Sequence, residues 1–166
     1  IVIGAPEGYL PGGAGYAMVF DPVGPPAAWS QPAGTGCGPG AAPPVLVIPS
    51  PFLGQSRPIA VSGASPSTSG ILFVSSPPYG ITPLPGTCSL ALDPATVTPF
   101  LAFTTSSSGS WSTTFVLPPD PAWAGTRLAL QAALYPSLSP LGADLTNGVH
   151  IQLGWGSAGG PPGRPA

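Results

Sequence analysis

Charged side chains are almost missing from this sequence. Its 166 residues include no lysine, three arginines and five acids, so charged residues make up 5% of the chain and the net charge is −2. A typical soluble domain carries roughly 25% charged residues. Three basic groups cannot neutralise a run of phosphates, which excludes a nucleic-acid partner. No apolar run approaches the ~20 residues of a membrane-spanning helix, so no membrane span is expected.

Side chains that could carry chemistry are scarce as well. His150 is the single histidine, and alternation along its predicted strand places it on the surface, opposite the apolar residues. No Gly-x-Ser-x-Gly motif for a nucleophilic serine is present. Asp21, Asp93 and Asp120 each precede a proline, where aspartate commonly initiates a turn. We therefore predict no enzymatic activity, no metal site and no cofactor.

Cysteine occurs only twice, as Cys37 and Cys88. An even count in a small, weakly charged chain favours one disulfide and therefore an oxidising compartment. Two buried free thiols are the alternative. A bridge would close a loop of about 50 residues and contribute roughly 4 kcal/mol in the chain-entropy description. We accordingly expect a secreted, extracellular protein.

Glycine and proline, in contrast, are abundant, with 24 and 27 residues. Proline recurs too often for long helices, and from residue 45 onward short apolar segments alternate with clusters of turn residues. This pattern predicts an all-β fold, an antiparallel β-sandwich of the jelly-roll or immunoglobulin-like type. The expected strands are Val45–Ile48, Pro58–Ser62, Gly70–Ser75, Cys88–Leu92, Val97–Thr104, Trp111–Leu117, Arg127–Tyr135 and Val149–Leu153.

Composition divides the chain into four predicted parts. Two short apolar runs, Ile1–Ile3 and Tyr16–Phe20, are separated by turn residues, a pattern typical of a β-hairpin. The dense glycine and proline that follow indicate a linker of polyproline character. The predicted parts are an N-terminal hairpin segment (1–21), a linker (22–36), the β-sandwich (37–154) and a glycine- and proline-rich tail (155–166).

Alternation along the strands indicates which residues are buried. In the segment that begins at Trp111, this tryptophan, Thr113, Phe115 and Leu117 share one face, because side chains alternate in a strand. We expect Phe115 to be buried, so its replacement by alanine should cost about 3–5 kcal/mol. The predicted core consists of Leu46, Phe73, Leu90, Phe115, Leu128, Leu130, Ile151 and Leu153.

Two further features each allow two interpretations. The segment Thr104–Ser110 is rich in serine and threonine and is interpreted as a hairpin loop; an acceptor for O-linked glycans is the alternative. The four tryptophans stand in four separate segments, which favours core or interface positions over a platform for stacking sugars.

The first 20 residues resemble half of an FG-GAP repeat, the blade of integrin-type β-propellers. The resemblance lies in Ile1-Val-Ile-Gly-Ala-Pro6 followed by Gly15-Tyr-Ala-Met-Val-Phe20. In that family an apolar strand enters Gly-Ala-Pro and a second strand ends in Val-Phe. The D-x-D-x-D-G calcium loop of those blades is absent, so no calcium site is implied, and one half-blade cannot close a propeller.

Much of the remaining chain is similar to the cysteine-paired C-terminal module of large secreted bacterial proteins, which often follows FG-GAP regions. The matching residues are Gly36-Cys37-Gly38, Pro44-Val-Leu46, Pro85-Gly-Thr-Cys88-Ser-Leu90, Phe115-Val-Leu-Pro118, Gly125-Thr-Arg-Leu128, Gln131 and Val149-His-Ile-Gln-Leu-Gly154. The resemblance implies secretion, pairing of the two cysteines and a β-sandwich. It implies no activity, because the shared motifs are structural glycines, prolines and cysteines.

Low charge is the feature that points to a function. A surface with so few charges exposes uncharged, partly apolar patches, which mark interaction sites. We predict a non-enzymatic extracellular structural subunit that self-associates as a homo-oligomer or homopolymer, in a fibre or surface layer. An adhesion or carbohydrate-binding module of a larger secreted protein is the alternative.

The N-terminal segment is the predicted means of assembly. An isolated two-stranded hairpin is not stable in water, so its strands must lie on a sheet. That sheet is either a neighbouring subunit's, through strand addition, or the chain's own sandwich, and both remain open. The predicted assembly residues are Ile1, Val2, Ile3, Tyr16, Met18 and Phe20.

Overall fold

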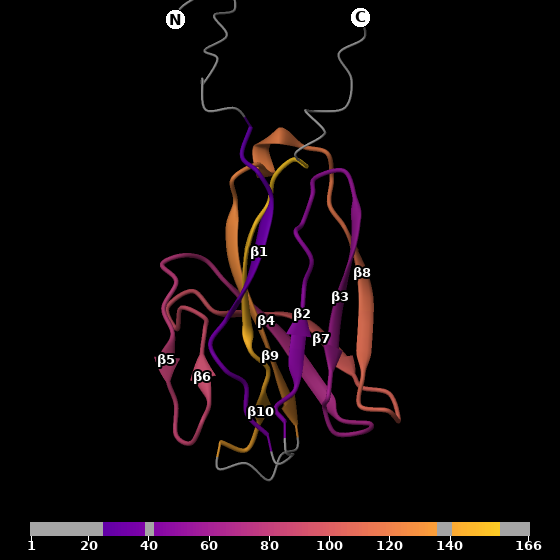
Figure 1. The fold of residues 1–166 in the computed structure, drawn as a ribbon, viewed down its shortest axis with the longest axis vertical. Coiled ribbons are helices and arrows are strands. Elements are labelled where there is room, and N and C mark those ends of the chain that lie inside the picture. Colours follow the sequence, from indigo (N-terminus) through magenta and orange to yellow (C-terminus); the bar gives the residue numbers. More distant parts are fainter. Residues whose placement is uncertain (1–24, 39–41, 136–140, 157–166) are drawn as a thin grey trace, which may run out of the picture.

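The computed structural model describes residues 25–38, 42–135 and 141–156, which form two facing antiparallel β-sheets (Figure 1). The larger sheet has the order β1-β11-β9-β4-β7, with β10 also paired to β9, and the smaller has the order β2-β3-β8. A ribbon of β5 and β6 lies apart from both. The strands are β1 (Trp29–Ala33), β2 (Val45–Val47), β3 (Ser56–Ser62), β4 (Ser69–Ser75), β5 (Thr82–Pro83), β6 (Ser89–Leu90), β7 (Thr98–Thr104), β8 (Trp111–Val116), β9 (Arg127–Tyr135), β10 (Asp144–Leu145) and β11 (Gly148–Gln152).

The predicted all-β sandwich is therefore confirmed, and each of the eight predicted strands overlaps an observed one. The chain changes sheets between β1 and β2, β3 and β4, β7 and β8, and β8 and β9. Glycines with positive φ occupy several connections, among them Gly63 (φ 72°) and Gly125 (φ 84°). Glycine adopts this left-handed backbone conformation readily because it lacks a Cβ.

The main core lies between the two sheets. Strand β9 shows how the sequence builds it, because Leu130, Ala132 and Leu134 point toward the smaller sheet while the residues between them point away. Dispersion and the hydrophobic effect in this layer hold the two sheets together. The buried core residues are Leu46, Ile48, Leu53, Ile59, Val61, Leu72, Phe103, Leu117, Leu130, Ala132, Leu134, Val149, Ile151, Leu153 and Trp155.

A second layer covers the outer face of the larger sheet. Ala129, Gln131 and Ala133 on that face of β9 are buried, because the segment that carries β5 and β6 packs over them. Ala91 in this segment is fully buried and lies so close to β11 that a Cβ on Gly148 would be 2.2 Å from its own Cβ. The larger sheet is thus covered on both faces, which explains why β9 is apolar on both.

The predicted linker is wrong where it contains β1. Trp29–Ala33 forms the edge strand of the larger sheet, in register with β11 from Trp29 opposite Gln152 to Ala33 opposite Gly148. The density of proline concealed this strand, but an edge strand tolerates a proline such as Pro32 because one side of its backbone needs no partner. The sandwich therefore begins before residue 37.

The predicted tail also begins too early. Trp155 is only 6% exposed, and its N–H donates to the Pro26 carbonyl oxygen at 3.0 Å. The sandwich therefore extends to this tryptophan. The predicted hairpin over 1–21 and the rest of the tail, 157–166, lie outside the described residues.

The predicted core is correct for Leu46, Leu130, Ile151 and Leu153, which are buried, and Leu128 is half-buried against them. The prediction is wrong for two half-buried residues that lie outside this core: Phe73 is opposite Gln131 on the outer face of the larger sheet, and Leu90 belongs to β6. The prediction is wrong for Phe115, which is 39% exposed. Its strand, β8, is the edge of the smaller sheet, so within the described residues no strand lies beyond it to cover the ring. Alternation placed the side chain on the inner face but could not show that the strand is at an edge.

Helical structure is confined, in the described part of the chain, to the 3-10 turn η1 (Pro121–Trp123). The structure accordingly shows no helix there that is long and apolar enough to cross a membrane.

Candidate interaction surface

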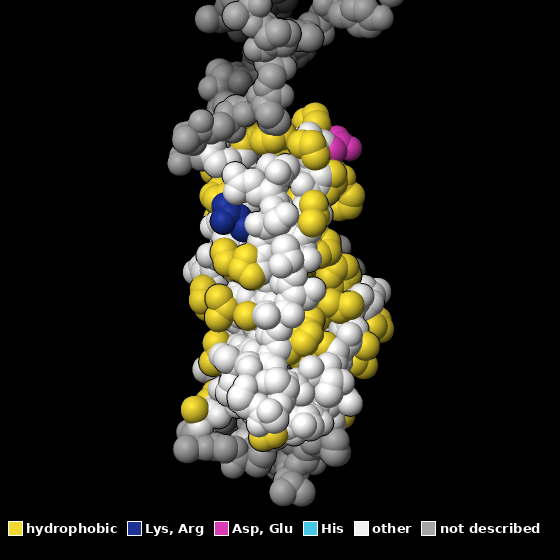
Figure 2. Space-filling view, turned by 90° about the vertical axis from the view of Figure 1, so that its right-hand side faces the viewer, with side chains coloured by type: hydrophobic (Ala, Val, Ile, Leu, Met, Phe, Trp, Pro, Cys, Tyr) yellow, Lys and Arg dark blue, Asp and Glu magenta, His cyan; other side chains and the backbone are white. Residues whose placement is uncertain are grey.

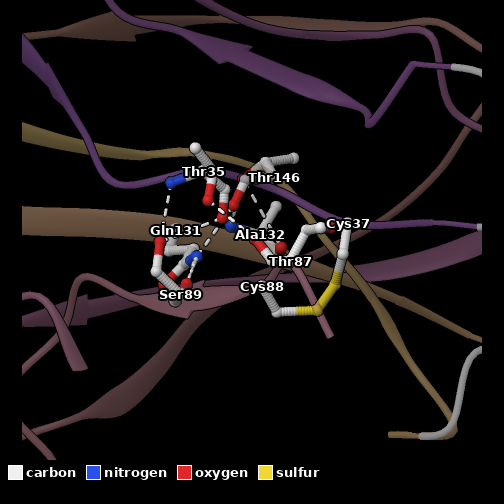
Figure 3. Close-up of a disulfide and its surroundings, with 8 residues drawn as sticks. All are labelled: Thr35, Cys37, Thr87, Cys88, Ser89, Gln131, Ala132 and Thr146. Carbon is white, nitrogen blue, oxygen red and sulfur yellow. Dashed lines mark hydrogen bonds between the residues drawn. A yellow bond between two sulfur atoms is a disulfide. The ribbon is translucent and has the colours of Figure 1, made fainter. Parts of the chain in front are cut away.

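The disulfide joins Cys37, which follows β1, to Cys88 in the outer layer (Figure 3). The two Cα atoms lie 5.0 Å apart and both side chains are buried. Cys37 also exchanges two backbone hydrogen bonds with Leu145, at 2.8 and 2.9 Å. The predicted pairing is confirmed, and its structural effect is to attach the outer layer to the edge of the larger sheet.

Polar groups beside the disulfide form hydrogen bonds with one another (Figure 3). The Thr35 N–H donates to Ser89 Oγ at 2.6 Å, and the Thr35 hydroxyl donates to the Thr87 carbonyl at 2.7 Å. Gly34 (φ 64°) brings the chains this close, since a Cβ there would lie 2.3 Å from Ser89 Oγ. This cluster therefore has a structural role.

Gln131 provides the central polar contact of the outer layer. Its side chain is 1% exposed; Nε2 donates to the carbonyl oxygens of Ser89 and Thr146 at 2.8 Å each, and Oε1 accepts from the Ala91 N–H at 3.0 Å. A single amide thus satisfies three buried backbone groups. The resemblance included Gln131 among its matching residues, but its role was not apparent from the sequence.

The single histidine lies beneath the outer layer. His150 is half-buried, its ring stacks on Tyr79 at a centroid distance of 4.3 Å, and Nε2 lies 3.2 Å from the Ala91 carbonyl oxygen. Burial raises the pKa of Tyr79 above its ordinary value of 10.0, and the nearby positive charge of Arg127 opposes that shift. The prediction that His150 lies opposite the apolar face of its strand is correct, but the predicted surface position is wrong, because the outer layer covers this side of β11.

Carboxylates have structural roles in turns. Asp93 Oδ1 accepts from the Ala95 N–H at 3.0 Å, and Asp120 Oδ1 accepts from the Ala122 N–H at 2.9 Å as the N-cap of η1. These are the turn contacts predicted for aspartate before proline. Within the described ranges, no group of three or more histidine, cysteine or acidic residues is placed to hold a metal ion.

Two aromatic pairs close the side of the sandwich where β7 and β8 meet. Phe103 on β7 stacks on Trp111 of β8, with centroids 4.3 Å apart, and Phe100 meets Phe115 edge to face at 5.6 Å. The first pair belongs to the core and its margin, whereas Phe100 and Phe115 are exposed. Side chains rather than backbone hydrogen bonds therefore join the two sheets here.

This side carries an apolar surface with almost no charge. Phe100, Leu101, Phe115 and Val116 are all exposed, Val116 by 69%, and neither β7 nor β8 contains a charged residue. Figure 2 faces the side on which β8 lies and shows hydrophobic patches with few charged groups. We call these four residues the β7–β8 surface. The absence of charged residues from both strands is the feature of the sequence that could have located this surface.

The strand edges differ in how they are protected. On β2, the Asn147 side chain accepts from the Leu46 N–H at 2.9 Å and donates to its carbonyl at 3.2 Å, and the Ser30 hydroxyl donates to the Ile48 carbonyl. β7 contains Pro99 and a register shift opposite β4, and both features discourage further pairing. β8 has no proline, glycine or charge, so its outer edge is unprotected.

A shallow groove runs between β1 and β2 on the opposite side. Its volume is about 550 Å³, and its walls include Pro32, Pro44, Val45 and Val47. The lining offers no charged side chain. The groove has mainly apolar walls, and the side chains of Ser30, Thr35 and Asn147 in its lining already form hydrogen bonds within the fold.

The serine-rich segment crosses between the sheets. The residues between Thr104, the end of β7, and Trp111, the start of β8, form this connection, so the predicted hairpin is wrong: its two flanking strands belong to different sheets. Three hydroxyls, of Ser106, Ser108 and Ser110, lie within 2.8–3.1 Å of one another.

The predicted assembly residues Ile1, Val2, Ile3, Tyr16, Met18 and Phe20 lie outside the described part of the chain. The structure therefore brings together one of the two predicted sites, the disulfide, and adds a surface that sequence reasoning did not locate.

No protein-family model matches the chain, and no curated protein matches it. Among solved structures, part of the chain is similar to an AA10 lytic polysaccharide monooxygenase (LPMO) from Streptomyces lividans, with 15% sequence identity and a TM-score of 0.34. The match covers 63% of this chain and spans 58% of that protein. At this TM-score the likeness assigns neither an activity nor a ligand to the chain.

Proposed function

We propose that this protein is an extracellular, non-enzymatic structural subunit that self-associates by strand exchange into a fibre or surface layer. The observation that carries the proposal is the β7–β8 surface: exposed Phe100, Leu101, Phe115 and Val116 lie beside a strand edge without protection. Exposed apolar side chains gathered at one edge mark a site of protein association, and a free strand edge is a template for pairing.

The low content of charged residues supports the same proposal. A chain with 5% charged residues has little electrostatic repulsion to keep copies apart. Arg57 is a cation on β3, the neighbour of β8, and its guanidinium lies over the Phe52 ring at 4.6 Å. Arg57 is also the cross-strand partner of Phe115, so it is a cation that borders the β7–β8 surface rather than one of its four members.

The disulfide supports the extracellular part of the proposal. Structural disulfides persist in oxidising compartments and are rare in reducing ones. Both cysteines are buried and paired within one chain, so the bridge stabilises the subunit and leaves neither sulfur for joining subunits.

Sedimentation velocity over a hundredfold range of concentration tests self-association. We expect large species for the native chain, and mainly monomer for the double variant Phe115→Ser and Val116→Thr. The matched control is Ile81→Thr, which removes an exposed aliphatic side chain (55% exposed) away from the β7–β8 surface and should assemble like the native chain.

A native chain that stays monomeric throughout contradicts the proposal. Binding of that monomer to an insoluble polysaccharide would favour the carbohydrate-binding alternative instead, and exposed Trp123 on η1 is then the first residue to replace.

A further inference from the structure

The backbone of β8 presents a defined set of unpaired groups at its outer edge. Leu46 on β2 directs its N–H and carbonyl to Asn147, away from β3. Hydrogen bonding alternates along antiparallel strands, so in the register of β2, β3 and β8 it is Ser112, Thr114 and Val116 whose backbone groups face outward.

Leu117, the residue after β8, confirms this alternation of inward and outward backbone groups. The Leu117 N–H donates to the Gln55 carbonyl at 3.2 Å, and the Leu117 carbonyl accepts from the Gly54 N–H at 3.0 Å. Odd-numbered residues of this segment therefore bond toward β3. The three even-numbered residues of β8 form a row of donors and acceptors that a further strand could pair with.

The chain itself contains a segment of matching chemistry. Tyr16–Phe20 has the sequence Tyr-Ala-Met-Val-Phe, with no charge, glycine or proline and large side chains at alternate positions. In an antiparallel register with Tyr16 opposite Phe115 and Phe20 opposite Trp111, these large side chains share the inner face of β8 and cover the exposed rings. Cross-strand aromatic pairs of this kind stabilise a sheet.

Geometry decides whether a chain's own segment or that of a second copy can form this antiparallel strand. Where the described chain begins, four segments lie side by side, since Ala27 bridges Trp155, Phe52 bridges Gly154, and Gly54 bonds to Leu117. A strand outside β8 is thus about four strand spacings from Ala27, or roughly 19 Å. These contacts are all at the Val116 end of β8.

The chain's own segment is too short to add an antiparallel strand. Phe20 opposite Trp111 lies a further ~20 Å along β8 from that end, so a connection from Phe20 to Pro26 that follows the surface of the fold would span roughly 27 Å. The six peptide units between these residues reach at most about 21 Å. A segment donated by a second copy has no such restriction.

We propose that Tyr16–Phe20 of one copy pairs antiparallel with the free edge of β8 in the next copy. The inference rests on the self-association proposed above and names its donor and its acceptor. Because donor and acceptor are different surfaces, the contact is heterologous, and it propagates as a ring or an open filament. Each subunit in the chain of copies gives one strand and receives one.

Two variants that each block one half of the contact test this inference. Thr114→Pro removes an outward N–H of β8 and should leave the pairing with β3 intact, as a proline does on an edge strand. Met18→Asp places a charge on the inner face of the donor. Ala17→Asp is the matched control, because it places the same charge on the donor's outer face.

We expect the Thr114→Pro variant and the Met18→Asp variant, each run alone in size-exclusion chromatography with light scattering, to elute as monomers of 16.3 kDa. Mixed in equal amounts they should form a species of twice that mass and nothing larger, since only one donor and one acceptor remain compatible. Ala17→Asp should assemble like the native chain. If circular dichroism shows that Thr114→Pro is unfolded, the double variant Ser112→Lys and Thr114→Lys replaces it.

Two results overturn the inference. If the native chain assembles but both blocked variants assemble equally well, or the two variants fail to combine, strand donation is wrong while self-association stands. If the native chain is monomeric and the Ala17 and Val19 amides are protected from hydrogen exchange, the segment docks on its own chain, and both proposals fail.

Discussion

Replacing Gln131 by leucine measures what holds the outer layer on the larger sheet. Leucine has nearly the same size, so the change removes hydrogen bonds without creating a large cavity. It leaves the Ala91 N–H and the carbonyl oxygens of Ser89 and Thr146 without the partner they have at 3.0, 2.8 and 2.8 Å. An unsatisfied buried backbone group costs about 1–3 kcal/mol.

Three such groups, two of them carbonyls at the lower end of that range, give an expected loss of about 3–5 kcal/mol. Domains of this size are stable by about 5–15 kcal/mol, so the loss is a large fraction of the total. Because 1 kcal/mol corresponds to about 2–4 °C for a chain of this length, the Tm should fall by roughly 6–20 °C.

Equilibrium unfolding in urea, followed by tryptophan fluorescence with the disulfide oxidised, gives the free energy directly. Gln55→Leu is the control, because Gln55 is exposed and its side chain accepts only an exposed contact from Arg57 at 2.6 Å; its effect should stay within about 0.5 kcal/mol. A loss below about 1 kcal/mol for Gln131→Leu would show that packing and the disulfide, rather than this amide, hold the outer layer.

Three further outcomes follow from the same structure. Replacing Cys37 and Cys88 together by alanine should lower the free energy of unfolding by about 4 kcal/mol, as expected for a bridge across 51 residues, and an unchanged urea midpoint would contradict this. Phe115→Ala should cost only about 1 kcal/mol, against about 3–5 kcal/mol for the fully buried Leu72→Ala; equal losses would mean that Phe115 is covered in the folded chain. Because the folded pKa of Tyr79 is raised above 10.0, the unfolded chain loses its proton first, so stability is full below pH 10 and falls above it. That alkaline decline should be smaller in Tyr79→Phe, and identical pH profiles by thermal unfolding would refute the assignment.

The sandwich could be predicted because its strands alternate. In β9 the leucines and alanines of 128–134 follow a period of two, and the observed strand has the predicted bounds. The cysteine pair could be predicted from its number and from the character of the chain. The strand prediction depends on the alternation of apolar residues, and the disulfide prediction depends on amino-acid composition. Both can be taken directly from the sequence.

Position within the sheets could not be predicted. Phe115 and Leu130 have the same alternation in their strands, yet one strand is an edge and the other is central, and only the strand order separates them. β1 was missed because Pro32 conceals a strand whose partner, β11, lies more than a hundred residues away. The role of Gln131 could not be predicted, because its sequence position resembles that of a polar residue on an exposed sheet face and does not show that the outer layer covers it.

The unequal protection of the sheet edges bears on whether low charge is merely a bias of composition. Natural edge strands are commonly protected by lysine, which this chain lacks altogether. If the bias were the whole cause, every edge would be open. Instead β1 carries Pro32, β7 carries Pro99 and a register shift, and β2 is bonded by the Asn147 amide. Protection by uncharged means at three edges indicates that the fold limits unwanted pairing. Among the described strands, β8 is the edge that lacks such protection, as the proposed strand donation requires.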